Sequence, residues 1–449
     1  MEMFDQANQF HLEGKYPEAE DLYDQLLSQN HDNAGLLATM GTLYLKMSKL
    51  GLAISFLHRA AQKTPQSDIL CNLAIAYKYS GQLDKAHKYF KDAIQHKPSA
   101  DAMANYAALF TNNGTPDEGI ALSKKAIKLD YECAVAHWNL AMALLEKGEW
   151  AQGWDEQEWG FKSKMRIDRG VGSYPYWDGT PGQTLWVFGE QGIGDEIMFA
   201  SMLPDLMRQN TVILECHPRL VTLFKDSFPG LTVYGTRDGT SVDWTQNHEI
   251  DARVSIGSLG KWFRRERSAF PGTPYLKSSC AERGSKYRVG ISWTGGLKPG
   301  RIRARTIPLS WWKSILDVPE VEFVSLQYTD CAEEIAMVNG LGYDIKQFDA
   351  VKADDYADTA KLVQSCDLVI TIATSVYHLA GALGVPAWVM VPNKPAWREQ
   401  ISGGIPFYRS VRVYRQPAGD ADAWIPVVER VGYDLSERMA AQAKQLRAA

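Results

Sequence analysis

The chain has 449 residues, enough for two to four domains at about 150 residues each. Its net charge of −5 does not favour nonspecific nucleic-acid binding, so an anionic ligand would need local arginines or helix ends. The sequence has no apolar run of about 18 residues, no signal-peptide pattern and no C-x-x-C motif among its six cysteines. We therefore expect a cytoplasmic protein without a membrane span, with reduced and mostly buried thiols.

A repeat occupies residues 1–164. A small residue recurs every 33 or 34 positions, at Gly14, Ser48, Gly81, Gly114 and Gly148. A second small residue follows five positions later in each unit, at Ala19, Ala53, Ala86, Gly119 and Gly153. Because an amphipathic segment lies on each side of the turn, we predict about five helical hairpins that stack into a solenoid with a concave groove.

The period and pattern of these hairpins resemble the tetratricopeptide repeat. That resemblance implies that the groove binds a polypeptide or packs on a neighbouring protein, while a purely structural array is the alternative. We expect an acceptor peptide to contact Asn72, Asn105 and Asn139, although each of these could equally be an ordinary helix-surface residue.

Past the segment that ends at Gln183, short β-rich runs alternate with helical stretches. The predicted strands are Thr184–Phe188, Thr211–Cys216, Thr232–Tyr234, Ala252–Ile256, Arg288–Trp293, Glu322–Leu326, Asp344–Lys346, Leu368–Ile372 and Ala387–Val391. This alternation predicts two doubly wound parallel sheets, in residues 165–285 and 286–449. The segment Ala421 to Leu446 predicts a long final helix that could cross back to the first block.

The stretch "GEQGIGDE", Gly189 to Glu196, follows the first predicted strand. It has the glycine spacing of a phosphate-binding loop but lacks the lysine, so a nucleoside triphosphatase is rejected. The third glycine of a dinucleotide fingerprint would fall on Ile197, and Glu215 keeps a dehydrogenase only as a weak alternative. Asp195 is either a helix cap or a general base at a cleft, where Gly192 and Gly194 would let substrate approach the backbone.

Basic and hydroxyl residues follow strands of the second block. Four cations, Lys298, Arg301, Arg303 and Arg305, come after "SW" and form either a diphosphate clamp or a solvated loop. Thr374 and Ser375 can cap the next helix and donate to a phosphate, and His378 is either a site residue or a packing residue. Gln327 follows another strand at the same edge of the sheet. Since no H-E-x-x-H motif occurs, we expect a metal-independent site.

These motifs resemble those of the heptosyltransferase-like glycosyltransferases of the GT-B architecture. The marks are "GEQGIGDEIMFASMLPDL", "GISWTGG", "VSLQ", "DYADTAKLVQSCDLVITI" and "SVYHLAGALGVPAWVMVP". The whole chain resembles bacterial tetratricopeptide-repeat proteins that carry this domain, some of which glycosylate flagellin. The resemblance implies that Asp195 is the base and that the basic loop contacts donor phosphates. It departs at Ala373, where the family has an acid, so the site either takes a different donor or is degenerate.

The resemblance thus implies an inverting glycosyltransferase that moves a sugar from a nucleotide-sugar donor to a Ser or Thr of a protein acceptor such as flagellin. Residues 165–285 would form the acceptor side and residues 286–449 the donor side. The alternative is a non-catalytic scaffold with a degenerate transferase-like module. A panel of nucleotides would distinguish these two functions.

Overall fold

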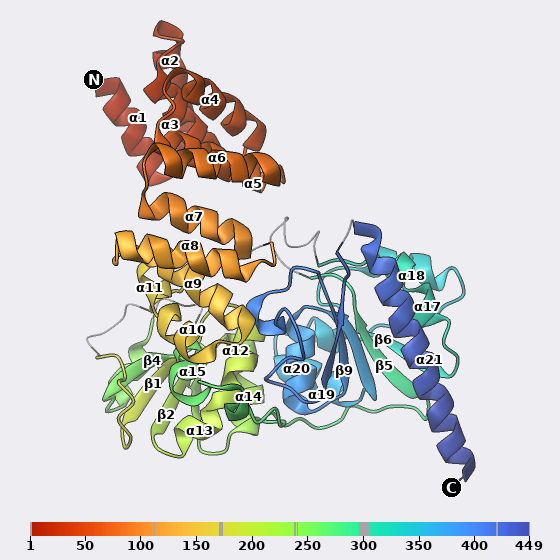
Figure 1. Cartoon of the computed structure of the whole chain (residues 1–449). Coiled ribbons are helices and arrows are strands. Elements are labelled where there is room, and N and C mark those ends of the chain that lie inside the picture. Colours follow the sequence, from red (N-terminus) through yellow and green to blue (C-terminus); the bar gives the residue numbers. More distant parts are fainter. Residues whose placement is uncertain are drawn as a thin grey trace. The chain divides into compact units, whose positions relative to one another are not determined.

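The computed structural model describes residues 2–111, 113–169, 174–237, 239, 241–295, 305–418 and 421–448 (Figure 1). The chain forms two compact units, Met1–Ala143 and Leu144–Ala449. The first is helical, and the second contains two parallel sheets with their helices.

The first unit consists of paired helices. They are α1 (Glu2–Glu13), α2 (Tyr16–Gln29), α3 (Ala34–Lys46), α4 (Leu50–Lys63), α5 (Ser67–Tyr79), α6 (Leu83–His96), α7 (Ala100–Thr111) and α8 (Pro116–Leu129). A fifth pair, α9 (Ala134–Lys147) and α10 (Trp150–Gln157), leads into the second unit. The predicted hairpins are therefore confirmed.

The turn between the two helices of each hairpin needs a left-handed backbone. Gly14, Gly81, Gly114 and Gly148 have φ between +76° and +80°, and Ser48 has φ of +58°. Glycine adopts this conformation without a steric penalty, which explains why a small residue recurs at this position. The second small residue lets the helices touch: a Cβ at Gly153 would lie 2.7 Å from Cδ2 of Leu145.

The first sheet of the second unit is parallel and has the strand order β3-β2-β1-β4. Its strands are β1 (Thr184–Phe188), β2 (Thr211–Glu215), β3 (Thr232–Tyr234) and β4 (Ala252–Ser255). The helices of this sheet are α12 (Ile193–Phe199), α13 (Leu203–Met207), α14 (Val221–Ser227) and α15 (Gly260–Phe263), and the short α11 (Trp159–Lys162) precedes it. The order equals the first four strands of a Rossmann sheet, 3-2-1-4.

The second sheet is parallel and has the order β10-β9-β8-β5-β6-β7. Its strands are β5 (Tyr287–Ser292), β6 (Val321–Ser325), β7 (Ile345–Lys346), β8 (Leu368–Ile372), β9 (Ala387–Val391) and β10 (Val411–Arg415). Its helices are α17 (Lys313–Leu316), α18 (Ala332–Asn339), α19 (Tyr356–Gln364), α20 (Ser375–Leu383) and α21 (Ile425–Ala448). Read from β5, this is the complete Rossmann order 3-2-1-4-5-6.

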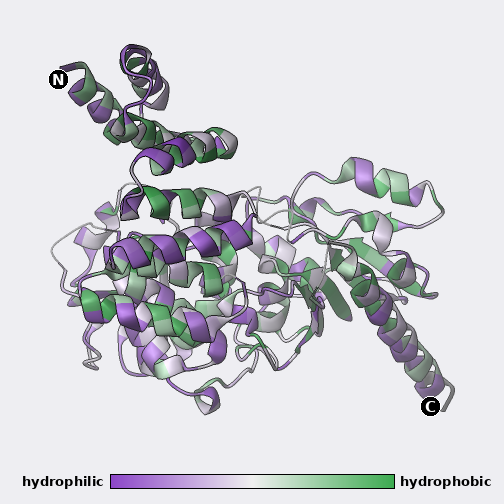
Figure 2. Cartoon of the chain, turned by 45° about the horizontal axis from the view of Figure 1, so that its top comes forward, coloured by the Kyte–Doolittle hydropathy of each residue, from purple (hydrophilic) through white to green (hydrophobic). Residues whose placement is uncertain are grey.

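Burial on both faces explains why the strands were readable from the sequence. Every residue of β5, β8 and β9 is buried, and Figure 2 shows the central strands in the hydrophobic colour. Parallel strands covered by helices on both sides read as continuous apolar runs. The predicted strands match the observed ones within one residue at each end, and among the described residues β10 is the one strand without a prediction.

Two expectations about the ends of the α/β region differ from the structure. The last helix does not cross back to the first sheet: α21 packs on α17, and Val428, Val431 and Leu435 join the core of the second sheet. The compact α/β unit begins at Leu144, about twenty residues before the expected boundary at residue 165. The reason is that α10 packs on α15, where Nε1 of Trp154 donates a hydrogen bond to the Arg264 carbonyl at 2.7 Å.

Candidate functional site

Asp195 lies in the first turn of α12, the helix that follows β1 at the carboxyl edge of the first sheet. Gly192 precedes the first helical turn, and Asp195 is the third helical residue. The Gly192 N–H donates to Oδ2 of Asp195 at 3.2 Å. Gly192 rather than Asp195 is therefore the N-cap residue, while the Asp195 carboxylate closes the same turn.

The other carboxylate oxygen of Asp195 faces the second sheet. Nε of Arg398 donates to Oδ1 of Asp195 at 2.6 Å, and Nη2 of Arg398 contacts the same oxygen. Arg398 belongs to the short 3-10 helix Trp397–Glu399, which follows β9. Both side chains keep some exposure, 15% for Asp195 and 19% for Arg398, so solvent reaches the pair.

Charge around Arg398 favours its cationic form. Burial opposes that form, but the carboxylates of Asp195 and Glu399 outweigh it and raise the pKa of Arg398 above its usual range. Glu399 itself accepts a hydrogen bond from the Tyr377 hydroxyl at 2.7 Å. The site therefore joins an acid from the first sheet to a fixed cation from the second.

The start of α20 forms the second part of the site. Oγ1 of Thr374 accepts a hydrogen bond from the Val376 N–H at 3.3 Å, so Thr374 caps the helix as predicted. The Ser375 hydroxyl accepts a hydrogen bond from Tyr356 at 3.1 Å. The first turn of this nine-residue helix presents backbone N–H groups, which favour an anion.

His378 is a buried, neutral residue one turn into α20. Its Nδ1 shares a hydrogen bond of 3.0 Å with the Tyr408 hydroxyl. Burial, followed by the charges of Arg398 and Arg305, lowers the pKa of His378 well below its usual value. The packing role weighed for His378 thus accounts for its environment, and its nearness to Arg305 and Arg398 keeps it beside the site.

Gly194 has a different role from the expected one. A Cβ there would lie 3.1 Å from Cδ2 of His378 and 3.2 Å from Cα of Ser375. The absent side chain therefore makes room for α20 to pack on α12, rather than for a substrate. As a result, α12, which carries Asp195, is in direct contact with α20, which begins after Thr374.

The basic loop after β5 is only partly described. Arg305 lies close enough to lower the pKa of His378, while Lys298, Arg301 and Arg303 lie outside the described residues. The loop begins beside the start of α20, because a Cβ at Gly295 would lie 2.6 Å from Cγ2 of Thr374.

Gln327 supports this loop instead of lining a cleft. Its side chain is buried, and its Oε1 accepts hydrogen bonds from the N–H groups of Trp293 and Thr294, both at 3.1 Å. Its Nε2 donates to the Thr294 carbonyl at 3.0 Å. The expected contact of Gln327 with a ligand is therefore corrected to anchoring of the backbone from which the basic loop starts.

Buried ion pairs hold the carboxyl edge of the first sheet, and the sequence did not reveal them. Arg166 meets Glu190 at 2.6 Å and also contacts Glu158 at 2.7 Å. Arg169 meets Glu215 at 2.8 Å. Because Glu215 is fully buried and already paired, it cannot bind a ribose, and the dehydrogenase alternative loses its support.

The three asparagines of the repeats are half-buried and bonded within the first unit. Nδ2 of Asn72 donates to Thr42 at 3.3 Å, and Nδ2 of Asn139 donates to the Ala104 carbonyl at 2.8 Å. Nδ2 of Asn105 donates to the Asp101 carbonyl of its own helix at 3.0 Å. Two of them therefore tie neighbouring hairpins together, and their contact with a peptide stays a prediction.

Arg398 is the main residue that sequence reasoning missed. It lies 203 positions from Asp195 in a segment that reads as a loop. The available signal was indirect: three acids, Glu190, Asp195 and Glu196, fall in one glycine-rich stretch, and buried acids need cationic partners.

Neither metal-binding clusters nor membrane-spanning helices occur in the described part of the chain. There, no group of three or more His, Cys, Asp or Glu side chains could hold a metal ion. No helix among these residues is both long and apolar enough to cross a bilayer. The six cysteines are unpaired, and five of them are buried.

Together, the fold and the site define a protein in which an array of helical repeats is followed by an α/β region with two Rossmann-type sheets. The family model for the tetratricopeptide repeat matches residues 67–100, so the helical unit consists of tetratricopeptide repeats. Such repeats serve protein–protein contact.

The chain is similar to one curated protein over a stretch longer than the repeats. Protein FlbA of Caulobacter vibrioides is 30% identical over 336 residues, which cover 68% of this chain and 56% of FlbA. The chain thus spans little more than half of that relative's length. Among solved structures, the thermophilic repeat protein TTC0263 of Thermus thermophilus is 20% identical with a TM-score of 0.32, over 34% of this chain and 86% of that one. MamA is 18% identical with a TM-score of 0.31, over 35% and 94%.

Proposed function

We propose that the chain is a metal-independent, inverting glycosyltransferase of the GT-B type. It would move a sugar from a nucleotide-sugar donor to a Ser or Thr of a protein acceptor such as flagellin. The observation that carries the proposal is the meeting of Asp195 with Arg398 and the start of α20 at the carboxyl edges of two Rossmann-type sheets.

The topology supports a ligand site at this place. In open parallel sheets, ligands bind beyond the carboxyl ends of the strands where the strand order reverses. That point lies between β1 and β4 in one sheet and between β5 and β8 in the other. Asp195 follows β1, the basic loop follows β5, and Thr374 follows β8.

Asp195 would act as the general base. An acceptor hydroxyl would give its proton to the carboxylate while its oxygen attacks the anomeric carbon from the face opposite the leaving group. The bond from that carbon to the phosphate oxygen then breaks, and the electron pair leaves with the nucleoside diphosphate. Arg398 would keep the carboxylate oriented toward the second sheet in this reaction.

Positive charge in the second sheet would stabilise the leaving diphosphate. Arg305 and Arg398 contribute guanidinium groups, and the capped start of α20 contributes N–H groups. Lys298, Arg301 and Arg303 would join them from the adjoining loop. Fixed cations of this kind take the part that a metal ion has in other transferases.

The repeats would hold the polypeptide acceptor. Stacked helical hairpins form extended surfaces suited to an unfolded or looped segment, and we assign Asn72, Asn105 and Asn139 to that surface. The resemblance to flagellin-modifying proteins motivates the choice of flagellin as an acceptor.

A scaffold remains the second candidate, for two reasons. Ala373 stands where the family has an acid that touches the donor, and Asp195 already has an ionic partner in Arg398. A degenerate module would keep the fold and the pair without binding a donor.

Isothermal titration calorimetry with UDP, ADP, GDP and CMP separates the two functions. The transferase predicts that at least one nucleotide binds, and that Arg398→Gln weakens binding by about tenfold or more. Arg412→Gln serves as the matched control, because Arg412 is half-exposed and pairs with Asp434 on α21. Absence of binding by all four nucleotides at millimolar concentration would favour the scaffold.

A further inference from the structure

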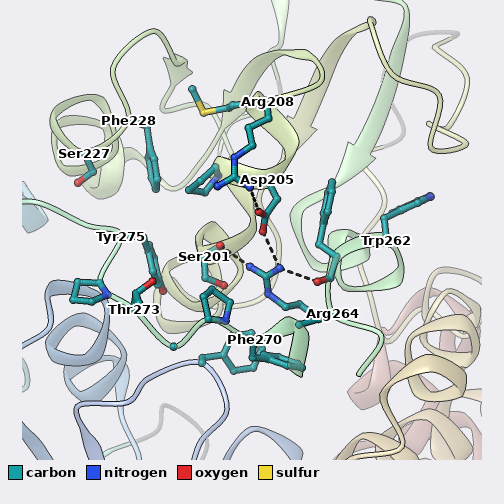
Figure 3. Close-up of a pocket in the computed structure, with 18 of the residues that line it drawn as sticks. Ser201, Asp205, Arg208, Ser227, Phe228, Trp262, Arg264, Phe270, Thr273 and Tyr275 are labelled. Carbon is teal, nitrogen blue, oxygen red and sulfur yellow. Dashed lines mark hydrogen bonds and ion pairs between the residues drawn. The ribbon is translucent and has the colours of Figure 1, made fainter. Parts of the chain in front are cut away.

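A cavity of about 770 Å³, which Asp195 does not line, lies between α13, α15 and the segment Phe270–Tyr275 that leads to the second sheet (Figure 3). Aromatic and proline residues make half of its lining. The aromatic ones are Phe228, Trp262, Phe263, Phe270, Tyr275 and Phe407. Its volume is in the range of small-molecule sites, and its lining mixes aromatic with polar side chains.

Two buried polar atoms, on residues that line this cavity, lack hydrogen-bond partners among the described residues. They are the Ser201 hydroxyl, on a residue 9% exposed, and Nε of Arg264, on a residue 3% exposed. The other Arg264 nitrogens are satisfied: Nη1 donates to Asp205 at 2.8 Å and Nη2 to the Ser201 carbonyl at 2.9 Å. Leaving such groups unpaired is unfavourable, so a ligand oxygen that reaches them would stabilise the structure.

The charges on the wall favour an anion. Asp205 is the single carboxylate among the lining residues, and it is shared between Arg264 and Arg208. Arg208 meets Oδ1 of Asp205 at 2.8 Å and is mostly exposed at the rim. Arg208 and Arg264 together carry two positive charges, and Asp205 neutralises one of them. One net positive charge therefore remains at this part of the wall.

We propose that this cavity is a second ligand site, for a small molecule with a flat apolar body and one carboxylate or phosphate group. The anionic group would accept hydrogen bonds from Nε of Arg264 and the Ser201 hydroxyl. The body would lie against Trp262, Phe228 and Phe270. This site does not depend on the proposed transfer reaction.

The position of the cavity connects it to the rest of the second unit. Tyr275 lines the wall, and its hydroxyl donates to the carbonyl of Ile197 in α12 at 2.7 Å. Gly272, in the same segment, accepts a hydrogen bond from the Arg409 N–H at 2.9 Å. A bound molecule therefore contacts a segment fixed to both sheets, and it should raise the unfolding temperature of the unit.

The test uses the full chain with phenyl phosphate and benzoate as probes, followed by calorimetry and by thermal unfolding. Inorganic phosphate and benzyl alcohol are the matched controls, since each carries only one half of the proposed ligand. We expect at least one probe to bind about tenfold more tightly than either control and to raise the unfolding temperature.

Substitutions in the cavity wall test whether the probes bind there. Ser201→Val and Arg208→Gln should each weaken probe binding about threefold or more, while Arg265→Gln leaves it unchanged. Arg265 is the matched control because it adjoins Arg264 but pairs with Asp155 outside the cavity. The proposal is overturned if neither probe binds at millimolar concentration. It also fails if Ser201→Val and Arg208→Gln both bind like the wild type.

Discussion

Glu146 is a buried carboxyl group whose titration should set the pH dependence of stability in the second unit. It is 3% exposed, and its Oε1 has no hydrogen-bond partner among the described residues. Burial, with a smaller contribution from the Glu399 carboxylate, raises the pKa of Glu146 to about 7.

The sign of the effect follows from this raised pKa. The folded chain holds the Glu146 proton more tightly than the unfolded chain does. The stabilisation is therefore complete below pH 4.5, the ordinary pKa, and is lost as the pH rises through about 7. At about 1.4 kcal/mol per pKa unit, the loss by pH 8 is at most about 3 kcal/mol.

Glu146→Gln, which mimics the protonated form, should remove this loss. We expect the variant to match the wild type near about pH 5 and to exceed it by up to about 3 kcal/mol near about pH 8. Urea unfolding followed by tryptophan fluorescence measures this, because all of the 14 tryptophans except Trp138 lie in the second unit. Glu149→Gln, at a half-exposed neighbour, is the control. A stability difference that is the same at both pH values would refute the reasoning.

Three further single substitutions and one double substitution test the backbone conformation, the packing and a buried ion pair. Ser48→Gly should stabilise the repeats by about 0.5–1 kcal/mol, since Ser48 has φ of +58°; circular dichroism during unfolding checks this, and a loss of stability would contradict it. Gly153→Ala should cost about 1–3 kcal/mol in fluorescence-monitored unfolding, because its methyl group would lie 2.7 Å from Leu145. Arg166→Met should cost about 3–5 kcal/mol by leaving Glu190 buried and unpaired. Adding Glu190→Gln should then recover part of that loss, and no recovery would argue against the pair.

The repeats and strands could be predicted because local physics fixes them. The left-handed turn favours glycine at Gly14 and its equivalents, and strands such as Leu368–Ile372 are buried throughout because helices cover both faces. The strand β10, Val411–Arg415, escaped prediction because it lies at the edge of its sheet and alternates with exposed or half-exposed side chains.

The candidate site was predictable only where residues follow strands. Asp195 and Thr374 were identified because the carboxyl ends of parallel strands gather side chains. Their partners were not, since an ion pair such as Asp195 with Arg398 depends on how two sheets pack, 203 residues apart. For the same reason, the sequence does not show that Gly194 makes room for α20, or on which helix α21 packs.

In the proposed reaction, Asp195 would remove the proton from an acceptor hydroxyl. Source cells that lack the gene are complemented with the wild type, with Asp195→Asn or with the control Asp155→Asn. Mass spectrometry of their flagellin and secreted proteins then tests this role. Asp155 is suited as the control because it also pairs with an arginine, Arg265, but is about half-exposed. We predict glycosylated Ser or Thr peptides with the wild type and the control, and a rate of modification reduced about 10²–10⁴-fold with Asp195→Asn at equal protein level. Modification by Asp195→Asn at the wild-type level would contradict the account.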